Sequence, residues 1–156
     1  MEKFIESLEK AKKTIEKSDH LTYITCNIVK DKKLLLKILE EIKSSITDCL
    51  NALLQYEYIY KRIKLYKDPK SNFEIFENKC AQRYEITKEE INLIKEIFKL
   101  TAQHKQSAIE FIRREKVIIL SDTMQQKTLT IEKIKQYLQI SKKIYEKTNN
   151  KILRKV

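Results

Sequence analysis

The chain contains no glycine and only one proline, Pro69, among its 156 residues. Glycine supplies backbone with positive φ and proline breaks helices, so their scarcity favours long helices. The lack of glycine also excludes the Gly-rich loops that hold phosphate groups in Walker and Rossmann nucleotide sites. The nucleophile elbow of α/β-hydrolases, whose strained turn uses flanking glycines, is excluded for the same reason.

Cysteine and histidine are also scarce. Cys26, Cys49 and Cys80 are odd in number and widely spaced, which predicts reduced, buried thiols and no disulfide framework. No cysteine pair has zinc-finger spacing, and the chain lacks both HExxH and the paired Glu-x-x-His pattern of di-iron bundles. We therefore expect no metal and no cofactor.

No apolar run approaches the length that a bilayer requires, and the charged start Met1-Glu2-Lys3-Phe4 is unlike a signal peptide. These features predict a soluble, cytoplasmic protein with no membrane contact, forming one helical domain over residues 1–156 with frayed final residues. Abundant Lys, Glu, Ile and Tyr without tryptophan are typical of a thermophile and favour an archaeal source. An AT-rich coding bias would give a similar composition.

Apolar residues recur every three or four positions, which predicts an all-α bundle of about five helices. The first helix extends to about Val29 and either bends or restarts at Ser18-Asp19. The second is capped by Asp31 and ends at Asp68-Pro69, because the residue before a proline is kept out of helical geometry.

Two sequences of capping-box form predict where the next helices begin. Ser71-Asn72-Phe73-Glu74 opens a short helix and Thr87-Lys88-Glu89-Glu90 opens a longer one. Helical order then fails between residues 107 and 130, where the β-rich run Val117-Ile118-Ile119-Leu120 is followed by Lys127-Thr128-Leu129. This stretch predicts either a small β-hairpin or an irregular segment, after which Thr130 caps the last helix.

The positive charge is unevenly spread along the chain. The net charge is +11, and residues 131–156 contribute +6 of it, with eight basic and two acidic residues. At 100° per residue, Lys143, Lys147 and Lys151 follow one line of the last helix, with Lys133 and Arg154 close to it. Such a face is either a solvated surface or a contact for an anionic partner such as RNA, DNA or an acidic protein.

A second basic region combines lysines with tyrosines near the end of the second predicted helix. Its aromatic and basic residues are Tyr56, Tyr58, Tyr60, Lys61, Arg62, Lys64, Tyr66 and Lys67. Single-strand binders place stacking surfaces beside phosphate-binding charges in this way. The alternative is that tyrosines on the apolar stripe are core residues, and helical spacing puts Tyr56, Tyr60 and Ile63 on that stripe. Only Tyr58 and Tyr66 then remain for a partner.

Two histidines are candidates for chemistry. His20 follows Asp19 at a predicted helix boundary, whereas His104 and Lys105 lead into Arg113 and Arg114, where the helical pattern breaks down. Polar irregular segments on rigid scaffolds often carry function, so these four residues form a candidate polar site. An ordinary helix end, with cations near its negative pole, explains His104 and Lys105 equally well. No catalytic residue is assigned.

A basic helical chain of this length, with a long second helix and a break before the last helix, resembles the HEPN group of helical domains. That resemblance implies RNA cleavage or a nucleotide-transfer partner. The family's motif of an arginine closely followed by a histidine is absent, because Arg83 is the nearest arginine before His104. Residues 18–23 and 104–119 also resemble uncharacterised small archaeal helical proteins, which implies no activity.

The charge asymmetry predicts a non-enzymatic helical interaction module, for which a homodimer is one candidate assembly. Its basic face would contact RNA, DNA or an acidic protein. One alternative is a divergent RNA-processing protein, or the inactive partner of one. The other is a structural subunit of a larger complex, which would expose a sizeable apolar patch.

Overall fold

The computed structural model describes residues 2–29, 31–106, 109–113, 116–120 and 126–153, with the backbone alone for 106 and 109–113. Within these ranges the chain forms five helical segments and one small sheet, as the apolar spacing predicted. The segments are α1 (Lys3–His20) continuing through η1 (Leu21–Thr25) and α2 (Cys26–Ile28), then α3 (Leu34–Ile59), then α4 (Pro69–Ile75) with η2 (Phe76–Cys80), then α5 (Lys88–Gln106) and finally α6 (Ile131–Leu153).

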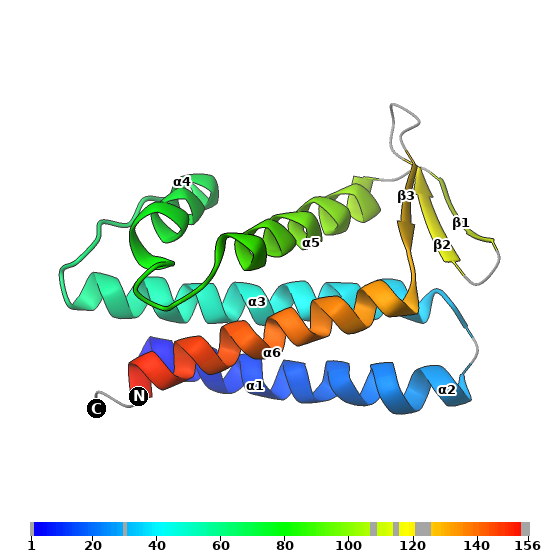
Figure 1. The fold of residues 1–156 in the computed structure, drawn as a ribbon, viewed down its shortest axis with the longest axis horizontal. Coiled ribbons are helices and arrows are strands. Elements are labelled where there is room, and N and C mark those ends of the chain that lie inside the picture. Colours follow the sequence, from blue (N-terminus) through cyan, green and yellow to red (C-terminus); the bar gives the residue numbers. More distant parts are fainter. Residues whose placement is uncertain (1, 30, 107–108, 114–115, 121–125, 154–156) are drawn as a thin grey trace.

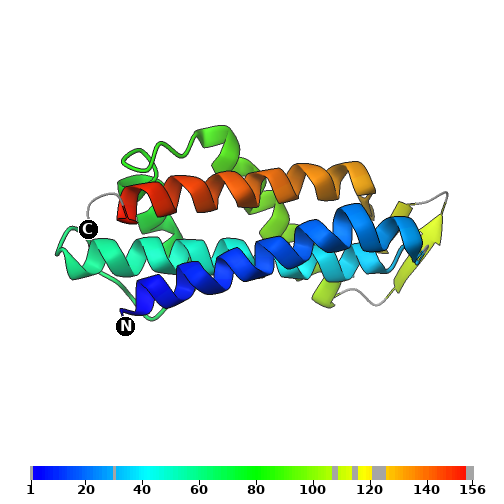
Figure 2. The same cartoon turned by 90° about the horizontal axis from the view of Figure 1, so that it is seen from below.

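Helix α3 is the centre of the bundle. It packs against α1, α5 and α6, and Figures 1 and 2 both show α1, α3 and α6 running along the long axis of the molecule. Its apolar residues recur at helical spacing and face the neighbouring helices. The fully buried ones are Ile38, Leu39, Ile42, Ile46, Cys49, Ala52 and Leu53. The long second helix of the sequence prediction is therefore confirmed, and it forms the main core.

The N-terminal helix continues past Ser18 and is not restarted there. The Ser18 hydroxyl donates a 2.8 Å hydrogen bond to the carbonyl of Thr14, and Thr22 donates one of 2.7 Å to the carbonyl of Ser18. Buried hydroxyls that bond back four residues loosen a helix, and a π-helical turn begins here at Leu21. Neither Ser18 nor Asp19 acts as a cap.

The predicted end of the second helix was wrong. Helix α3 stops at Ile59, because Lys61 takes the left-handed conformation with φ of 59° and the amide of Arg62 donates to the carbonyl of Glu57 at 3.0 Å. This is the backbone pattern that closes many helices and is usually built on glycine. Tyr60 is the C-cap of α3 and is 54% exposed, although its ring still lies 4.7 Å from that of Tyr56. Ile63 is buried from the segment beyond the helix.

Among the residues that the structure describes, positive φ occurs at Lys61 and Glu85, both beside helix ends. A side chain in this conformation costs about 1–2 kcal/mol, which glycine avoids. We expect Glu85→Gly to raise the free energy of unfolding by up to about 1 kcal/mol in urea titrations, because the relief of about 1–2 kcal/mol is partly offset by the greater entropy of the unfolded chain with glycine. Gln82→Gly, where φ is negative, is the matched control and should lower it. A loss of stability in Glu85→Gly would contradict this account.

The start signals at Thr87 and Thr130 were right, and those at Asp31 and Ser71 were wrong. Helix α3 begins at Leu34 with Lys33 as its N-cap and no side-chain cap, because Asp31 accepts from the amide of Lys33 in the turn before the helix, at 3.0 Å. Thr87 and Glu90 form the reciprocal capping box, at 2.9 and 3.1 Å, and the Thr130 hydroxyl accepts from the amide of Lys133 at 3.2 Å. Helix α4 instead begins at Pro69, with Asp68 accepting from the amide of Lys70 at 3.1 Å. Proline at the first helical position explains why the helix starts earlier than the Ser71 signal.

The β-rich stretch forms an antiparallel sheet in the order β1 (Ile109–Arg113), β2 (Lys116–Leu120) and β3 (Gln126–Leu129). The pairing of β2 with β3 matches the predicted hairpin, with Ile118 opposite Thr128. Strand β1 was not predicted. The core side of the sheet buries Val117, Ile119 and Leu129, which fixes it at the end of the molecule away from the termini (Figure 1).

The three cysteines are free thiols, and Cys49 and Cys80 are buried as predicted. Burial raises the pKa of the Cys49 thiol to about 12 and that of Cys80 to about 11, so both remain protonated. In the part of the chain that the structure describes, no helix is long and apolar enough to span a membrane.

Candidate functional site

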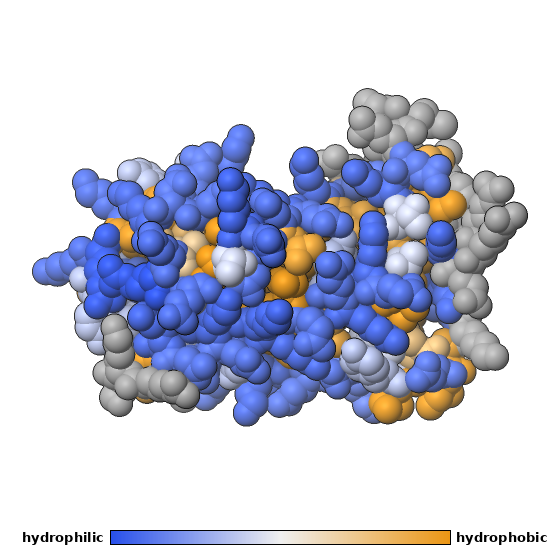
Figure 3. All heavy atoms as spheres, viewed as in Figure 1, coloured by the Kyte–Doolittle hydropathy of each residue, from blue (hydrophilic) through white to orange (hydrophobic). Residues whose placement is uncertain are grey.

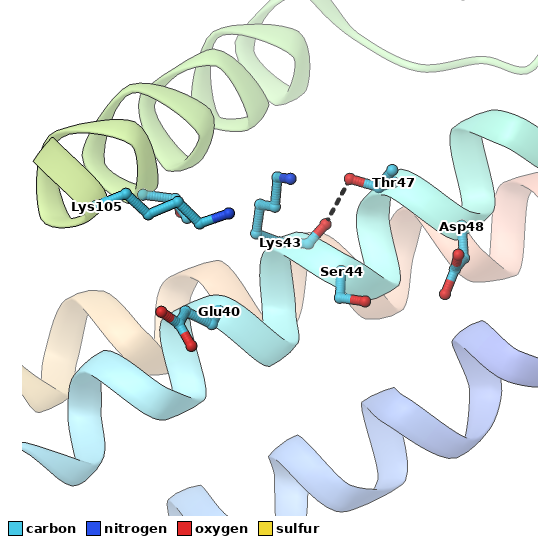
Figure 4. Close-up of a pocket in the computed structure, with 7 residues that line it drawn as sticks. Glu40, Lys43, Ser44, Thr47, Asp48 and Lys105 are labelled. Atoms are coloured by element: carbon cyan, nitrogen blue, oxygen red, sulfur yellow. Dashed lines mark hydrogen bonds between the residues drawn. The ribbon is translucent and has the colours of Figure 1, made fainter.

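A polar groove lies between α3 and the last turn of α5, with a volume of about 320 Å³. Five α3 residues at one helical face and two α5 residues line it: Glu40, Lys43, Ser44, Thr47, Asp48, Thr101 and Lys105. In Figure 4 the amino groups of Lys43 and Lys105 lie in the space between the two helices, above the carboxylate of Glu40. Lys105, predicted as part of a polar site, is therefore a wall of this groove, which we call the α3–α5 groove.

His104 lies beside the α3–α5 groove, where Glu40 of the groove wall holds its side chain. Its Nε2 is 3.1 Å from Oε1 of Glu40, which joins two residues 64 positions apart. This contact orients the imidazole. Two of the groove hydroxyls, those of Thr47 and Thr101, donate to backbone carbonyls of their own helices. The groove therefore brings a histidine, lysines and carboxylates together.

Asp48 is the electrostatically unusual residue of the groove. Burial raises the pKa of its carboxyl group, and the nearby Lys10 ammonium opposes that shift only partly. Its Oδ2 atom is buried and accepts no hydrogen bond from the residues that the structure describes. Burial penalises the charged form of this carboxyl group more than it would at an exposed aspartate, so its negative charge at neutral pH opposes folding.

We expect Asp48→Asn to be more stable than the wild type at neutral pH. The raised folded-state pKa means that the native state binds the extra proton, so the wild type loses stability as the pH rises through that pKa. The advantage of the variant should shrink as the pH falls towards about 3.9, the ordinary value for aspartate. Thermal unfolding at several pH values, with exposed Glu74→Gln as control, measures this. A difference independent of pH would refute the assignment.

The lysines predicted on one face of α6 make different contacts. Lys147 donates to Oε1 of Glu90 at 2.5 Å and to the carbonyl of Glu85 at 2.7 Å, and Lys133 donates to the carbonyl of Thr128 at 3.3 Å. Lys143 is exposed and Lys151 is half-buried, whereas Arg154 lies outside the described residues. The pKa of Glu90 is lowered, because the hydrogen bonds from Lys147 and Thr87 outweigh the effect of burial. Lys147 thus has a structural role, because it links α6 to the start of α5.

Two further predicted residues cannot be placed in a site. Arg114 lies outside the described residues, and Arg113 is described only as backbone, where it pairs with Lys116 at the β1–β2 turn. Of the four residues of the predicted polar site, the structure therefore places His104 and Lys105 at the α3–α5 groove.

The basic and aromatic region remains exposed to a larger extent than predicted. Residues 58–67, which we call the tyrosine–lysine segment, contain three tyrosines, four basic residues and no acidic residue. Tyr58, Tyr60 and Tyr66 are 55%, 54% and 57% exposed. Figure 1 places the segment at the end of the molecule where both termini lie, and the surface of that end is mainly hydrophilic in Figure 3.

A smaller apolar surface lies at the opposite end, where α2 ends. Tyr23, Ile24, Ile28 and Val29 are all exposed, Ile28 by 75%. Apolar surface is visible there in Figure 3. Ile24 lies in η1, and Ile28 is the last residue of α2.

The sequence prediction missed the contribution of α3 to the groove. Lys43, Ser44 and Thr47 are polar residues within a helix that is otherwise apolar on most sides, and their spacing places them on one line. That polar stripe is a signal that could have been read. Its counterpart on α5 could not, because the register between two helices depends on their packing.

Comparison with protein-family models, with curated proteins and with solved structures found no match to this chain. Within the described ranges, no group of three histidine, cysteine or acidic residues is placed to hold a metal ion. What the protein does must therefore be inferred from its own charges and surfaces.

Proposed function

We propose that this protein is a non-enzymatic helical module that binds nucleic acid through its positive charge. The observation that carries the proposal is the tyrosine–lysine segment, in which Lys61, Lys64 and Lys67 are exposed with no acidic residue between them. A polyanion gains affinity from each such lysine because counterions are released when phosphates are neutralised.

The fold supports this segment as the contact surface more than it supports α6. Two α6 lysines are already held by acidic partners, Lys142 by Asp19 and Lys147 by Glu90, both at 2.5 Å. A cation held in this way has less charge to offer a ligand. Lys151 can still extend the basic surface, because the C-terminal end of α6 lies at the same end of the molecule as the segment (Figure 1), whereas Lys143 lies in the middle of that helix.

The test is binding of labelled RNA and DNA between about 50 and about 200 mM salt. The variant Lys61→Gln, Lys64→Gln, Lys67→Gln should bind at least about tenfold more weakly, and its salt dependence should flatten by about two powers of salt concentration. The matched control removes three exposed lysines elsewhere, by Lys12→Gln, Lys13→Gln and Lys37→Gln. It should bind nearly as the wild type does.

Three results would count against the proposal. If the wild type binds neither RNA nor DNA at low salt, the proposed nucleic-acid binding is refuted. If both triple variants bind equally weakly, binding depends on net charge alone and not on the tyrosine–lysine segment. Binding of an acidic polypeptide without binding of nucleic acid makes an acidic protein the partner. A Lys143→Gln, Lys151→Gln variant tests the α6 face while leaving the ion pair of Lys147 intact.

The exposed apolar end of α2 favours a second candidate, a structural subunit. Surface residues such as Ile28 are normally covered when they form a contiguous patch. Sedimentation of the wild type and of Ile28→Lys would test it. A monomeric wild type at high concentration would exclude self-association through this end.

A further inference from the structure

We infer that the tyrosine–lysine segment selects single-stranded nucleic acid, with unpaired bases stacked on Tyr58, Tyr60 and Tyr66. This inference rests on the proposed function and adds the class of nucleic acid and the residues that read it. Every base has a π-face, and stacking on an aromatic side chain is open only to bases released from a duplex.

The first support is that no ring contact ties Tyr58 or Tyr66 to the core, whereas Tyr60 packs on the buried Tyr56 at 4.7 Å with one part of its ring. The apolar contacts at this end are made by Tyr56, which is 3% exposed and packs edge-on against Phe4 at 5.3 Å, and by the buried Ile63. Tyr58, Tyr60 and Tyr66 retain more than half of their surface in contact with solvent. Large aromatic rings left in water at one end of a bundle are available for a partner.

The second support is that rings and cations alternate along the chain. From Arg62 to Tyr66 the side chains alternate between exposed and at least partly buried. Ile63 and Leu65 pack on the core, whereas Lys64 and Tyr66 face the solvent. Phosphate-binding charge and a base-stacking surface are thus presented together on the outer side.

The third support is that hydrogen bonds hold the segment in one conformation. The Asn72 side chain accepts from the amide of Tyr66 and donates to its carbonyl, each at 2.8 Å. Arg62 is held by the buried Glu57 at 3.3 Å, and its guanidinium lies 5.3 Å from the centre of the Tyr60 ring. A surface fixed before binding loses less conformational entropy when the ligand arrives.

Duplexes cannot use this surface in the same way, because their bases are stacked within the helix and offer no free base face to an aromatic ring. A duplex would be bound by the lysines without help from the tyrosines. The expected preference is therefore for single strands, and the part of the affinity that comes from stacking should persist when salt has weakened the ionic part.

The experiment compares binding of a single-stranded oligonucleotide and of a hairpin duplex with the same number of phosphates. The test variant is Tyr58→Leu, Tyr60→Leu, Tyr66→Leu, which keeps the charge and most of the apolar volume. We expect it to bind single strands at least about tenfold more weakly and duplexes nearly unchanged. The matching triple substitution to phenylalanine should retain single-strand binding, because the rings remain.

Intrinsic fluorescence gives an independent readout, because the chain has eight tyrosines and no tryptophan. Stacked bases should quench wild-type emission, and the leucine variant should lose that change. Tyr23→Leu, at the other end of the molecule, is the control. Because Tyr60 packs on Tyr56 at 4.7 Å, the double variant Tyr58→Leu, Tyr66→Leu is used if the triple variant is less stable.

The outcomes separate this inference from the proposed function. Equal affinity for single strands and duplexes, unchanged in the leucine variant, overturns the stacking inference and leaves binding by charge in place. No binding of either oligonucleotide by the wild type overturns both. If the phenylalanine variant loses single-strand binding, the tyrosine hydroxyl groups and not the rings make the contact, which also overturns the inference.

Discussion

Glu57→Ala should lower the free energy of unfolding by about 3 kcal/mol, because it removes the acceptor of a buried polar network. Glu57 is 1% exposed and accepts from the Tyr84 hydroxyl at 2.8 Å. It also pairs with Arg62 at 3.3 Å and with Arg83 at 3.7 Å. The variant leaves a buried hydroxyl without its partner and two arginines without their counterion.

The size of this effect depends on how much water can reach the network. The two arginine side chains are 32% and 41% exposed, so solvent can compensate part of their loss. Tyr84 is 2% exposed and has no such access. The Tm should therefore fall by roughly 6–12 °C for the alanine variant, by less for Glu57→Gln, and by less again for Tyr84→Phe.

A matched control separates the buried network from an ordinary ion pair. Glu77 pairs with Lys95 at 2.8 Å, but both side chains are partly exposed. Glu77→Ala should cost less than about 1 kcal/mol. If thermal unfolding shows equal losses for Glu57→Ala and Glu77→Ala, burial of the carboxylate does not govern its contribution. Because Glu57 also holds Arg62, its removal should loosen the tyrosine–lysine segment as well.

The second large effect is expected in the middle of α3. Leu39→Ala should lower the free energy of unfolding by about 2–5 kcal/mol, because Leu39 is completely buried in the helix that α1, α5 and α6 all contact. The truncation removes apolar contacts and leaves a cavity that three packed helices cannot easily close. Urea unfolding monitored by circular dichroism measures the loss.

Two control variants give the scale for the effect of Leu39→Ala. Leu39→Ile keeps the volume and should cost less than about 1.5 kcal/mol. Lys37 lies on the exposed side of the same helix, and Lys37→Ala should change stability by no more than about 0.5 kcal/mol. A Leu39→Ala variant as stable as Lys37→Ala would mean that the bundle is not centred on α3.

Local sequence carried the information on where most helices lie. The apolar spacing of α1, α3 and α6, the capping box at Thr87 and the cap at Thr130 depend on residues within a few positions of one another, so they could be read without the fold. The β-rich run beginning at Val117 gave the pairing of β2 with β3 for the same reason. Strand β1 was missed because its sequence has no comparable turn signals around it.

The sequence by itself determined an all-helical frame, three free thiols and a strongly basic chain without phosphate-binding glycine loops. The tertiary structure decided which charged and aromatic side chains remain available. Lys147 meets Glu90 across 57 positions and His104 meets Glu40 across 64, because the register of packed helices sets these contacts. Ile63 reaches the core from beyond the helix because Lys61 closes α3 early, which a periodic pattern cannot show.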